Sequence, residues 1–217
     1  MSAVSVRLDG GHVAAVRNIY CIGRNYAEHA SELNNPVPGE PVVFMKATTA
    51  LRPLSAGELA FPRETFHHEA ELVLLLGREV PLGATVGWDA VAALGLGLDL
   101  TRREVQSGLK AKGLPWLIAK SFAGAAPVSE FLPCALFPDL ERIRFTLSVG
   151  GELRQTGDTQ AMLFKVPVLL TYLASLGALA AGDLVFTGTP KGVGPIRLGD
   201  DFRLEFPDLG RGFAGKL

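Results

Sequence analysis

The sequence has few of the residues that mark several common classes of protein. Its only two cysteines, Cys21 and Cys134, have no CxxC spacing, which excludes a disulfide framework and a thiolate metal site and is typical of a reducing compartment. Basic charge is not in excess, since 21 Lys and Arg oppose 22 Asp and Glu, so no nucleic-acid partner is expected. The most apolar stretch, residues 166–181, is too short to span a membrane. The N-terminus has no signal-peptide core. We therefore expect a cytoplasmic protein without a membrane partner.

Glycine and proline are plentiful. The chain has 25 glycines and 14 prolines in 217 residues, a composition typical of many turns and short strands. Hydrophobic residues make up 48% of the sequence, which is ordinary for a globular protein. No repeat, low-complexity tract or linker divides the chain, so we expect one domain covering residues 1–217, with mainly β architecture and a few helices.

Apolar runs and turn residues predict the elements of this architecture. Strands are expected at residues 18–23, 41–46, 69–77, 92–100, 144–149, 152–155, 184–186 and 202–206, the last of them paired with the C-terminal segment. Gly150-Gly151 predicts a tight hairpin turn. Helices are expected from Asn25 to about Leu33, from Thr101 to Gly113, and from Asp158 or Thr159 to Gly182.

Glu69 and Glu71 form the most informative pair of residues. In a strand, residues i and i+2 share a face, so the two carboxylates are expected side by side. The apolar residues that follow them predict a strand buried on both faces. Two like charges at the end of such a strand repel each other, and a cation between them relieves the repulsion. A solvated strand edge is the alternative, and the pair by itself leaves it open.

Asp99 is a third candidate ligand. It follows an apolar run and precedes the second predicted helix, so it can equally belong to the cap of that helix. If it joins the two glutamates, the site consists of oxygen atoms only, which favours Mg²⁺ or Mn²⁺ over zinc. His67 and His68 precede the first glutamate and keep a zinc site open, and either can instead orient a carboxylate.

Five short motifs follow one another along the chain. They are Gly23-Arg24-Asn25-Tyr26, His68-Glu69-Ala70-Glu71-Leu72, Leu98-Asp99-Leu100-Thr101 continuing to Gln106, Ala119-Lys120-Ser121-Phe122, and Thr187-Gly188-Thr189-Pro190-Lys191-Gly192-Val193-Gly194. In this order they resemble the fumarylacetoacetate hydrolase superfamily, and within it the small acylpyruvate hydrolase and oxaloacetate decarboxylase branch. The resemblance covers residues 18–206, after a short N-terminal segment, residues 1–17. It implies a mixed β-sandwich roll of the C-terminal-domain type, a catalytic domain alone, and a homodimer.

The resemblance also implies a set of site residues. The residues that would hold Mg²⁺ or Mn²⁺ are Glu69, Glu71 and Asp99. His29 and Glu32 would form a dyad on a mobile lid helix, and Lys120 would point into the site. The residues that would bind the substrate are Arg24, Arg103, Gln106 and Thr189. Without the resemblance, the dyad is more typical of an exposed helix face and Lys120 of a surface lysine.

These residues suit chemistry on small 2-oxo acids. Hydrolysis of an acylpyruvate and decarboxylation of oxaloacetate both pass through a pyruvate enolate, whose charge a divalent cation and Lys120 would stabilise. Hydrolysis also needs a base to activate water, the role expected for His29 with Glu32. We therefore expect a metal-dependent enzyme that cleaves a C–C bond and releases pyruvate. The alternatives are an isomerase or hydratase of dienoate intermediates in aromatic catabolism, and a non-catalytic protein that binds a carboxylate metabolite.

Overall fold

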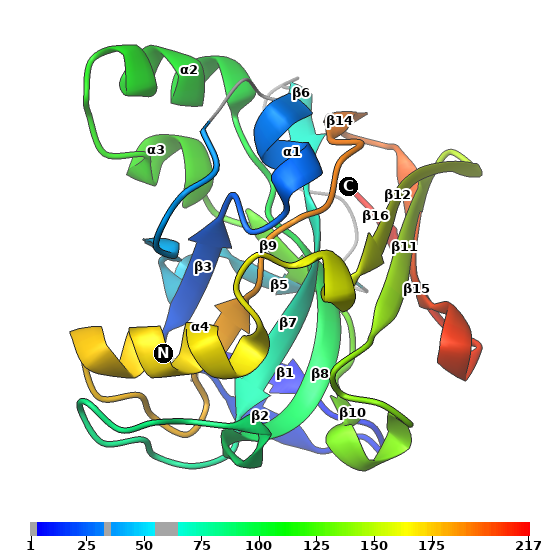
Figure 1. Ribbon diagram of the computed structural model, residues 1–217. Helices are drawn as coiled ribbons and strands as arrows, with labels where there is room; N and C mark the ends of the chain where they lie inside the picture. Colours follow the sequence, from blue (N-terminus) through cyan, green and yellow to red (C-terminus); the bar gives the residue numbers. More distant parts are fainter. Residues whose placement is uncertain (1–3, 33–35, 55–64) are drawn as a thin grey trace.

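A mixed β-sheet forms the centre of the fold (Figure 1). The computed structural model of the chain describes residues 4–32, 36–54 and 65–217. The strands of the central sheet are, in spatial order, β4 (Val42–Lys46), β3 (Ile19–Gly23), β13 (Leu184–Phe186), β7 (Ala70–Leu76), β8 (Val91–Leu98), β9 (Ala126–Val128) and β5 (Leu51–Pro53), and β10 (Leu132–Pro133) pairs with β8. β3 runs parallel to β13, and β5 runs parallel to β9, whereas the other pairs are antiparallel.

A second, antiparallel sheet packs against the first. Its strands are, in spatial order, β12 (Glu152–Asp158), β11 (Arg144–Val149), β15 (Asp201–Phe206) and β16 (Arg211–Lys216). Gly150 and Gly151 join β11 to β12 with φ angles of 58° and 82°, the left-handed conformation that a type I′ hairpin turn requires, so the predicted hairpin is confirmed. Two further pairs are β1 (Ser5–Arg7) with β2 (Val13–Ala15), and β6 (Thr65–His68) with β14 (Gly194–Arg197).

Four α-helices lie within the described residues, and three of them gather at one end of the central sheet (Figure 1). These three are α1 (Ala27–Glu32), α2 (Arg103–Ala111) and α3 (Leu117–Lys120), and the fourth is α4 (Val166–Leu176). Short 3₁₀ turns occur at Thr48–Ala50, Trp88–Ala90, Cys134–Leu136, Thr159–Ala161 and Pro207–Leu209. Over the same residues, no helix has the length and hydropathy needed to cross a membrane.

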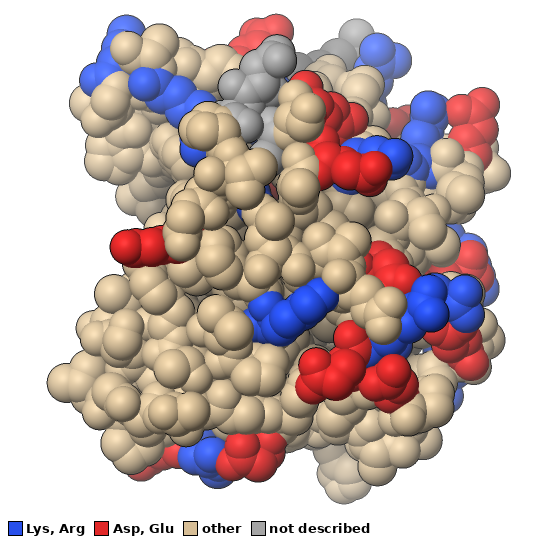
Figure 2. Space-filling view, viewed as in Figure 1, with Lys and Arg blue, Asp and Glu red and all other residues tan. Residues whose placement is uncertain are grey.

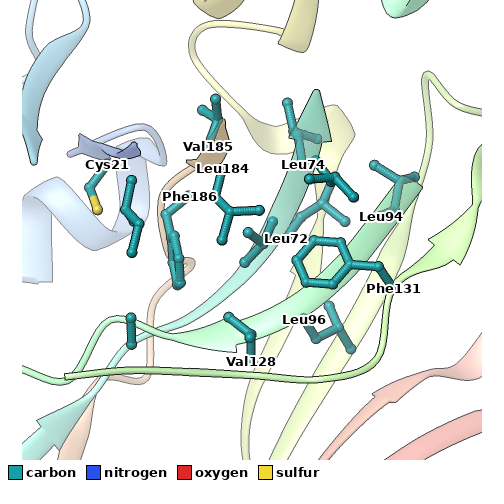
Figure 3. Packing of buried hydrophobic residues seen from close by; sticks show 14 of the residues in the cluster. Cys21, Leu72, Leu74, Leu94, Leu96, Val128, Phe131, Leu184, Val185 and Phe186 are labelled. Carbon is teal, nitrogen blue, oxygen red and sulfur yellow. The ribbon is translucent and has the colours of Figure 1, made fainter. Parts of the chain in front are cut away.

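β7 and β8 lie at the centre of the hydrophobic core. Every residue of β7 is buried, so this strand is covered on both faces, as the sequence predicts. Leu72 and Leu74 of β7 lie beside Leu94 and Leu96 of β8, with Phe131 packed against them (Figure 3). Buried residues of β11 and β15 continue this core into the second sheet. The expectation of a mainly β sandwich with a few helices is confirmed.

The predicted strands all form, with small shifts at their ends, but the helix starts were predicted wrongly. The second helix begins at Arg103, because Thr101 is held by backbone hydrogen bonds with His67, and its hydroxyl donates to the carbonyl of Asp99. Its end at Gly113 is confirmed, since this glycine has a φ of 65° and its N–H donates to the carbonyl of Lys110.

The first and last predicted helices also begin later than expected. α1 begins at Ala27, because the side chain of Asn25 bonds instead to the backbone of Phe164 and Thr187, and the predicted end at Leu33 lies outside the described residues. Asp158 ends β12 and caps only the 3₁₀ turn Thr159–Ala161, where its side chain accepts from the Gln160 N–H, and α4 begins at Val166. The short α3 and several two- to four-residue strands were not predicted.

A methyl group added at Gly97 of β8 tests the packing of the central sheet. That methyl would lie 2.8 Å from Phe186 and 3.0 Å from Val73, so Gly97→Ala is expected to destabilise the protein by about 1–3 kcal/mol. Gly108→Ala in α2 is the matched control, because its methyl meets nothing within 4 Å, and a gain of roughly 0.5–1 kcal/mol is expected there. Urea unfolding midpoints measure both changes. A Gly97→Ala protein as stable as the wild type would contradict the described packing.

Candidate metal centre

Three carboxylates meet at the end of β7 and β8. Glu69 lies in the short break between β6 and β7, Glu71 is the second residue of β7, and Asp99 directly follows β8. The antiparallel register brings them together, and the N–H of Asp99 donates to the carbonyl of Glu69 at 2.8 Å. One carboxylate oxygen from each residue lies within 4.8 Å of the other two. All three residues are buried, at 5% exposure or less, so the alternative of a solvated strand edge is wrong.

Cationic side chains surround this cluster. Lys120 at the end of α3 donates from Nζ to Glu69 Oε2 at 2.7 Å and to Asp99 Oδ2 at 2.5 Å. Arg103 of α2 donates to the other oxygen of Glu69. Lys120 is buried rather than on the surface, because these two carboxylates compensate its charge and raise its pKa although burial alone would lower it. Lys120 therefore lies among the three carboxylates and lines the same cavity, while its role stays a prediction.

Lys46 is a third cation of the cluster, and sequence reasoning missed it. Its Nζ lies 2.7 Å from Asp99 Oδ1, and it also donates to the backbone carbonyls of Lys120 and, at 3.4 Å, Leu100. The side chain is fully buried. A single lysine at the end of a strand has no distinctive spacing, so only the fold places it against Asp99.

The three carboxylates are not compensated equally. Burial, together with Asp99 and Glu69, raises the pKa of Glu71 well above its usual range, and the Gly188 N–H at 2.7 Å only partly opposes this. Burial also acts to raise the pKa of Glu69, but Lys120 and Arg103 outweigh it and hold that pKa well below its usual range. Glu71 therefore carries the least compensated charge. A buried, all-oxygen set with an uncompensated carboxylate fits a hard divalent cation such as Mg²⁺ or Mn²⁺.

The two histidines before Glu69 take no part in this cluster. His67 Nδ1 lies 3.4 Å from Arg103 Nε, and His68 Nδ1 bonds to Gln155 Oε1 at 3.0 Å. Within the described residues, the group with ligand atoms close enough to share a metal consists of carboxylates only. The zinc alternative is therefore not supported, and neither histidine is hydrogen-bonded to a carboxylate of the cluster.

His29 and Glu32 form a pair on α1. His29 Nδ1 lies 3.4 Å from Glu32 Oε2, and the backbone N–H of Gly192 donates to both oxygens of Glu32 at 3.1 and 3.3 Å. His29 is buried, and burial, aided by Arg103, lowers its pKa against the opposing influence of Glu69 and Glu32. The imidazole is therefore neutral near pH 7, with Nε2 as the proton-accepting nitrogen when Nδ1–H donates to Glu32.

Two backbone N–H groups of the glycine-rich loop at residues 187–194 donate to side chains of the protein itself. The N–H of Gly188 binds Glu71, and the N–H of Gly192 binds Glu32. The hydroxyl of Thr189 donates to the carbonyl of Ala70 at 2.8 Å and accepts from the amide of Gln155, also at 2.8 Å. The single proton of this hydroxyl is therefore engaged by the Ala70 carbonyl, and the expected role of Thr189 in substrate binding stays a prediction.

One cavity of about 30 Å³ connects the predicted residues. Its wall includes every predicted site residue except Glu32, which is paired with His29: Arg24, His29, Glu69, Glu71, Asp99, Arg103, Gln106, Lys120 and Thr189. Gln106 accepts from Arg103 Nη1 at 2.7 Å and so helps to hold that guanidinium. Phe44, Lys110 and Trp116 also line the cavity, and no motif in the sequence indicates them. The roles of these residues in binding and catalysis stay predictions.

Comparison with known proteins gives a consistent result. The sequence model of the family described as "Fumarylacetoacetate (FAA) hydrolase C-terminal" matches residues 18–212. The chain is 43% identical over 190 residues to the oxaloacetate tautomerase FAHD1, mitochondrial, of Bos taurus, with 86% of each chain covered. It is 41% identical over 188 residues to the oxaloacetate decarboxylase, mitochondrial, of Dictyostelium discoideum, covering 84% of this chain and 85% of the other.

A solved structure agrees with these relatives. The fumarylpyruvate hydrolase from Pseudomonas aeruginosa, crystallised in complex with Mn²⁺ and pyruvate, superposes with a TM-score of 0.90 at 33% sequence identity. The superposition covers 100% of this chain and 96% of that one.

Removal of Glu71 tests the metal assignment. Glu71→Ala is expected to weaken Mn²⁺ binding by at least roughly 100-fold, because loss of even an outer-shell partner costs 10–100-fold. Calorimetric titration with MnCl₂ measures the affinity. Glu79→Ala removes an exposed carboxylate and serves as the control, with unchanged affinity expected. Equal Mn²⁺ affinity in the Glu71→Ala and wild-type proteins would overturn the assignment.

Proposed function

The chain belongs to the fumarylacetoacetate hydrolase family, and from this premise we propose that it is a divalent-metal-dependent enzyme that cleaves a C–C bond in small 2-oxo acids and releases pyruvate. The leading activities are decarboxylation of oxaloacetate and hydrolysis of acylpyruvates. One observation carries the proposal: a buried carboxylate triad, a buried lysine and a neutral histidine line the same cavity.

Glu69, Glu71 and Asp99 would hold Mg²⁺ or Mn²⁺. Bound there, the cation would act as a Lewis acid toward the oxygens of a 2-oxo acid. The three carboxylates are buried together and offer only oxygen atoms as ligands, which supports this assignment. The similarity to a hydrolase crystallised with Mn²⁺ and pyruvate agrees with it.

Cationic side chains of the chain would stabilise the developing charge of the substrate. Cleavage at C3 of a 2-oxo acid leaves its electron pair on the pyruvate fragment, whose oxygen becomes negative as the bond breaks. Lys120 and Arg103 place fixed positive charge beside that position, in a buried site where electrostatic interactions are strong. Lys46 adds a further cation, whose Nζ lies 2.7 Å from Asp99 Oδ1.

His29 would act as the base that hydrolysis needs. Its neutral imidazole can take a proton from water as the water oxygen attacks the distal carbonyl of an acylpyruvate. Glu32, itself held by the Gly192 N–H, fixes the tautomer that leaves Nε2 free to accept the proton. Decarboxylation of oxaloacetate releases CO₂ without an attacking water, so it depends less on this base.

Interconversion of the keto and enol forms of oxaloacetate is a second candidate. It needs a base to remove a proton from C3 and a cationic site to hold the oxygen, and His29 and Lys120 line one cavity. The similarity to an oxaloacetate tautomerase supports it. An isomerase of dienoate substrates would use the same proton transfer. A non-catalytic binding protein is less well supported, because binding alone does not need the His29–Glu32 pair.

The homodimer and the cytosolic location stay predictions. Exposed apolar side chains on α3 and the adjacent edge strand β4, among them Met45 and Leu117, are compatible with a contact surface between two copies.

Release of pyruvate is the direct test of the proposed function. The protein is incubated with Mn²⁺ and either oxaloacetate or acetylpyruvate, and pyruvate is measured with a coupled lactate dehydrogenase assay. Pyruvate above the uncatalysed rate is expected from at least one of the two substrates. Absorbance of the enol form of oxaloacetate follows tautomerisation in parallel. Enol conversion without pyruvate from either substrate would replace the leading proposal by the tautomerase.

Replacement of His29 separates the two cleavage reactions. His29→Ala is expected to lower hydrolysis of acetylpyruvate by roughly 10²–10⁴-fold, because the water loses its base, while oxaloacetate decarboxylation falls less. Initial rates of pyruvate release at saturating Mn²⁺ measure both. His12→Ala, which removes an exposed histidine, is the control and should leave both rates unchanged. An equal loss of both activities in His29→Ala would show that the histidine is not specific to water activation.

A further inference from the structure

Two further cations line the cavity, and neither belongs to the metal cluster. Lys110 lies in the last turn of α2, and Arg24 directly follows β3. Lys110 Nζ lies 5.1 Å from the ring centroid of Trp116, a cation–π contact that holds it against the cavity wall. Arg24 adopts a φ of 58°, a left-handed conformation that is uncommon for a residue with a side chain. Its position is therefore set by the fold rather than by local preference.

These two cations differ from the other cations of the site in what compensates them. Arg103 and Lys120 are paired with carboxylates of the cluster. Over residues 4–32, 36–54 and 65–217, no carboxylate forms an ion pair with Arg24 or Lys110, and the buried Arg24 Nε has no hydrogen-bond partner.

The surroundings of Lys110 are mainly repulsive. Burial lowers its pKa, Arg24 and Arg103 lower it further, and Glu69 opposes them. Arg24 and Lys110 are thus close enough to repel each other while both line the cavity. Lys and Arg side chains also gather over α2 on the outer face, at the upper left of Figure 2. An anion that enters between the two cations would relieve this repulsion.

We propose that Arg24 and Lys110 bind the distal carboxylate of the substrate and make the site selective for 2-oxo dicarboxylates. The inference rests on the proposed function, which places the 2-oxo acid end of the substrate at Glu69, Glu71 and Asp99. The guanidinium of Arg24 offers a planar fork and Lys110 a point charge, a combination suited to one carboxylate. A substrate with an uncharged tail leaves both cations uncompensated, and this cost provides the discrimination.

Binding of two unreactive probes tests the proposal on the full chain with saturating Mn²⁺. The probes are 2-oxoglutarate, a dicarboxylate, and 2-oxobutyrate, a monocarboxylate, each titrated by calorimetry. Lys110→Met and Arg24→Met are each expected to weaken 2-oxoglutarate binding by at least about tenfold and 2-oxobutyrate binding by less than about twofold. Lys112→Met is the matched control: Lys112 is exposed at the end of the same helix, does not line the cavity, and should leave both affinities unchanged.

The size of the two losses distinguishes a built subsite from a general attraction. Removal of a charge that acts only through its long-range field changes the binding free energy of a dianion twice as much as that of a monoanion. The fold-change in dissociation constant for 2-oxoglutarate would then equal the square of the fold-change for 2-oxobutyrate. A 2-oxoglutarate loss no larger than that square, or no loss at all, overturns the proposal. Mn²⁺ affinity and the thermal midpoint, expected to stay at wild-type values, verify that both variants are folded.

The outcome is separable from that of the proposed function. If the wild-type protein releases no pyruvate from either substrate but the variants selectively lose 2-oxoglutarate, the proposed reaction fails and the dicarboxylate subsite stands. If pyruvate is released and the selective loss is absent, the reaction stands and the subsite fails.

Discussion

Mutual repulsion of three buried carboxylates is the constraint on which the rest of this site depends. Two unit charges 4.8 Å apart would repel by roughly 3.5 kcal/mol at an effective dielectric constant near 20, and the ligand atoms of Glu69, Glu71 and Asp99 all lie within that distance of one another. Ordinary domains are stable by only about 5–15 kcal/mol, so such a cluster persists only with cations around it. Lys120 and Arg103 compensate Glu69, and Lys120 and Lys46 compensate Asp99, whereas Glu71 has little beyond one backbone N–H. The shortage of positive charge is therefore concentrated at one side chain, next to the cavity.

Two parts of the fold produce this arrangement: the central sheet holds the carboxylates, and the segments at its end bring the side chains that surround them. The β7–β8 ladder, buried on both faces, fixes the backbone beside Glu71 and Asp99, so the carboxylates cannot move apart to relieve their repulsion. The compensating groups come from elements that are distant in sequence: β4, α2 and α3 bring the cations, and α1 brings His29. Gly188 and Gly192, in left-handed conformations, aim their N–H groups at Glu71 and Glu32. The loop thus links the ligand set to the dyad.

The features that can be predicted from the sequence are those determined by residues that lie close together in the chain. Two residues spaced i and i+2 in a strand share a face, and two consecutive glycines allow a tight hairpin turn. The shared face of Glu69 and Glu71 and the Gly150-Gly151 turn were therefore both predicted. Asp99 was ambiguous, because an acid before a helix is also a normal cap, and only the ladder with β7 decides between the two. The caps at Asn25 and Thr101 failed because tertiary partners, the Phe164 backbone and the His67 strand, take the groups that a local cap would use. Lys46 and Lys110 belong to no recognisable motif, so the neighbouring sequence does not indicate that they lie at the site.

The distribution of charge around the cavity also explains how one site can serve several reactions of 2-oxo acids. Bond cleavage and keto–enol exchange both build negative charge on the same oxygen, so they share the need for the cationic half of the site. They differ in what happens at the other end of the substrate, where a proton or a water must be handled and where a second carboxylate is present or absent. In this chain, His29 and two cations without a carboxylate partner among the described residues line the same cavity as the carboxylate cluster. Change at these positions can therefore alter reaction and substrate while the carboxylate cluster, which the core holds in place, stays as it is.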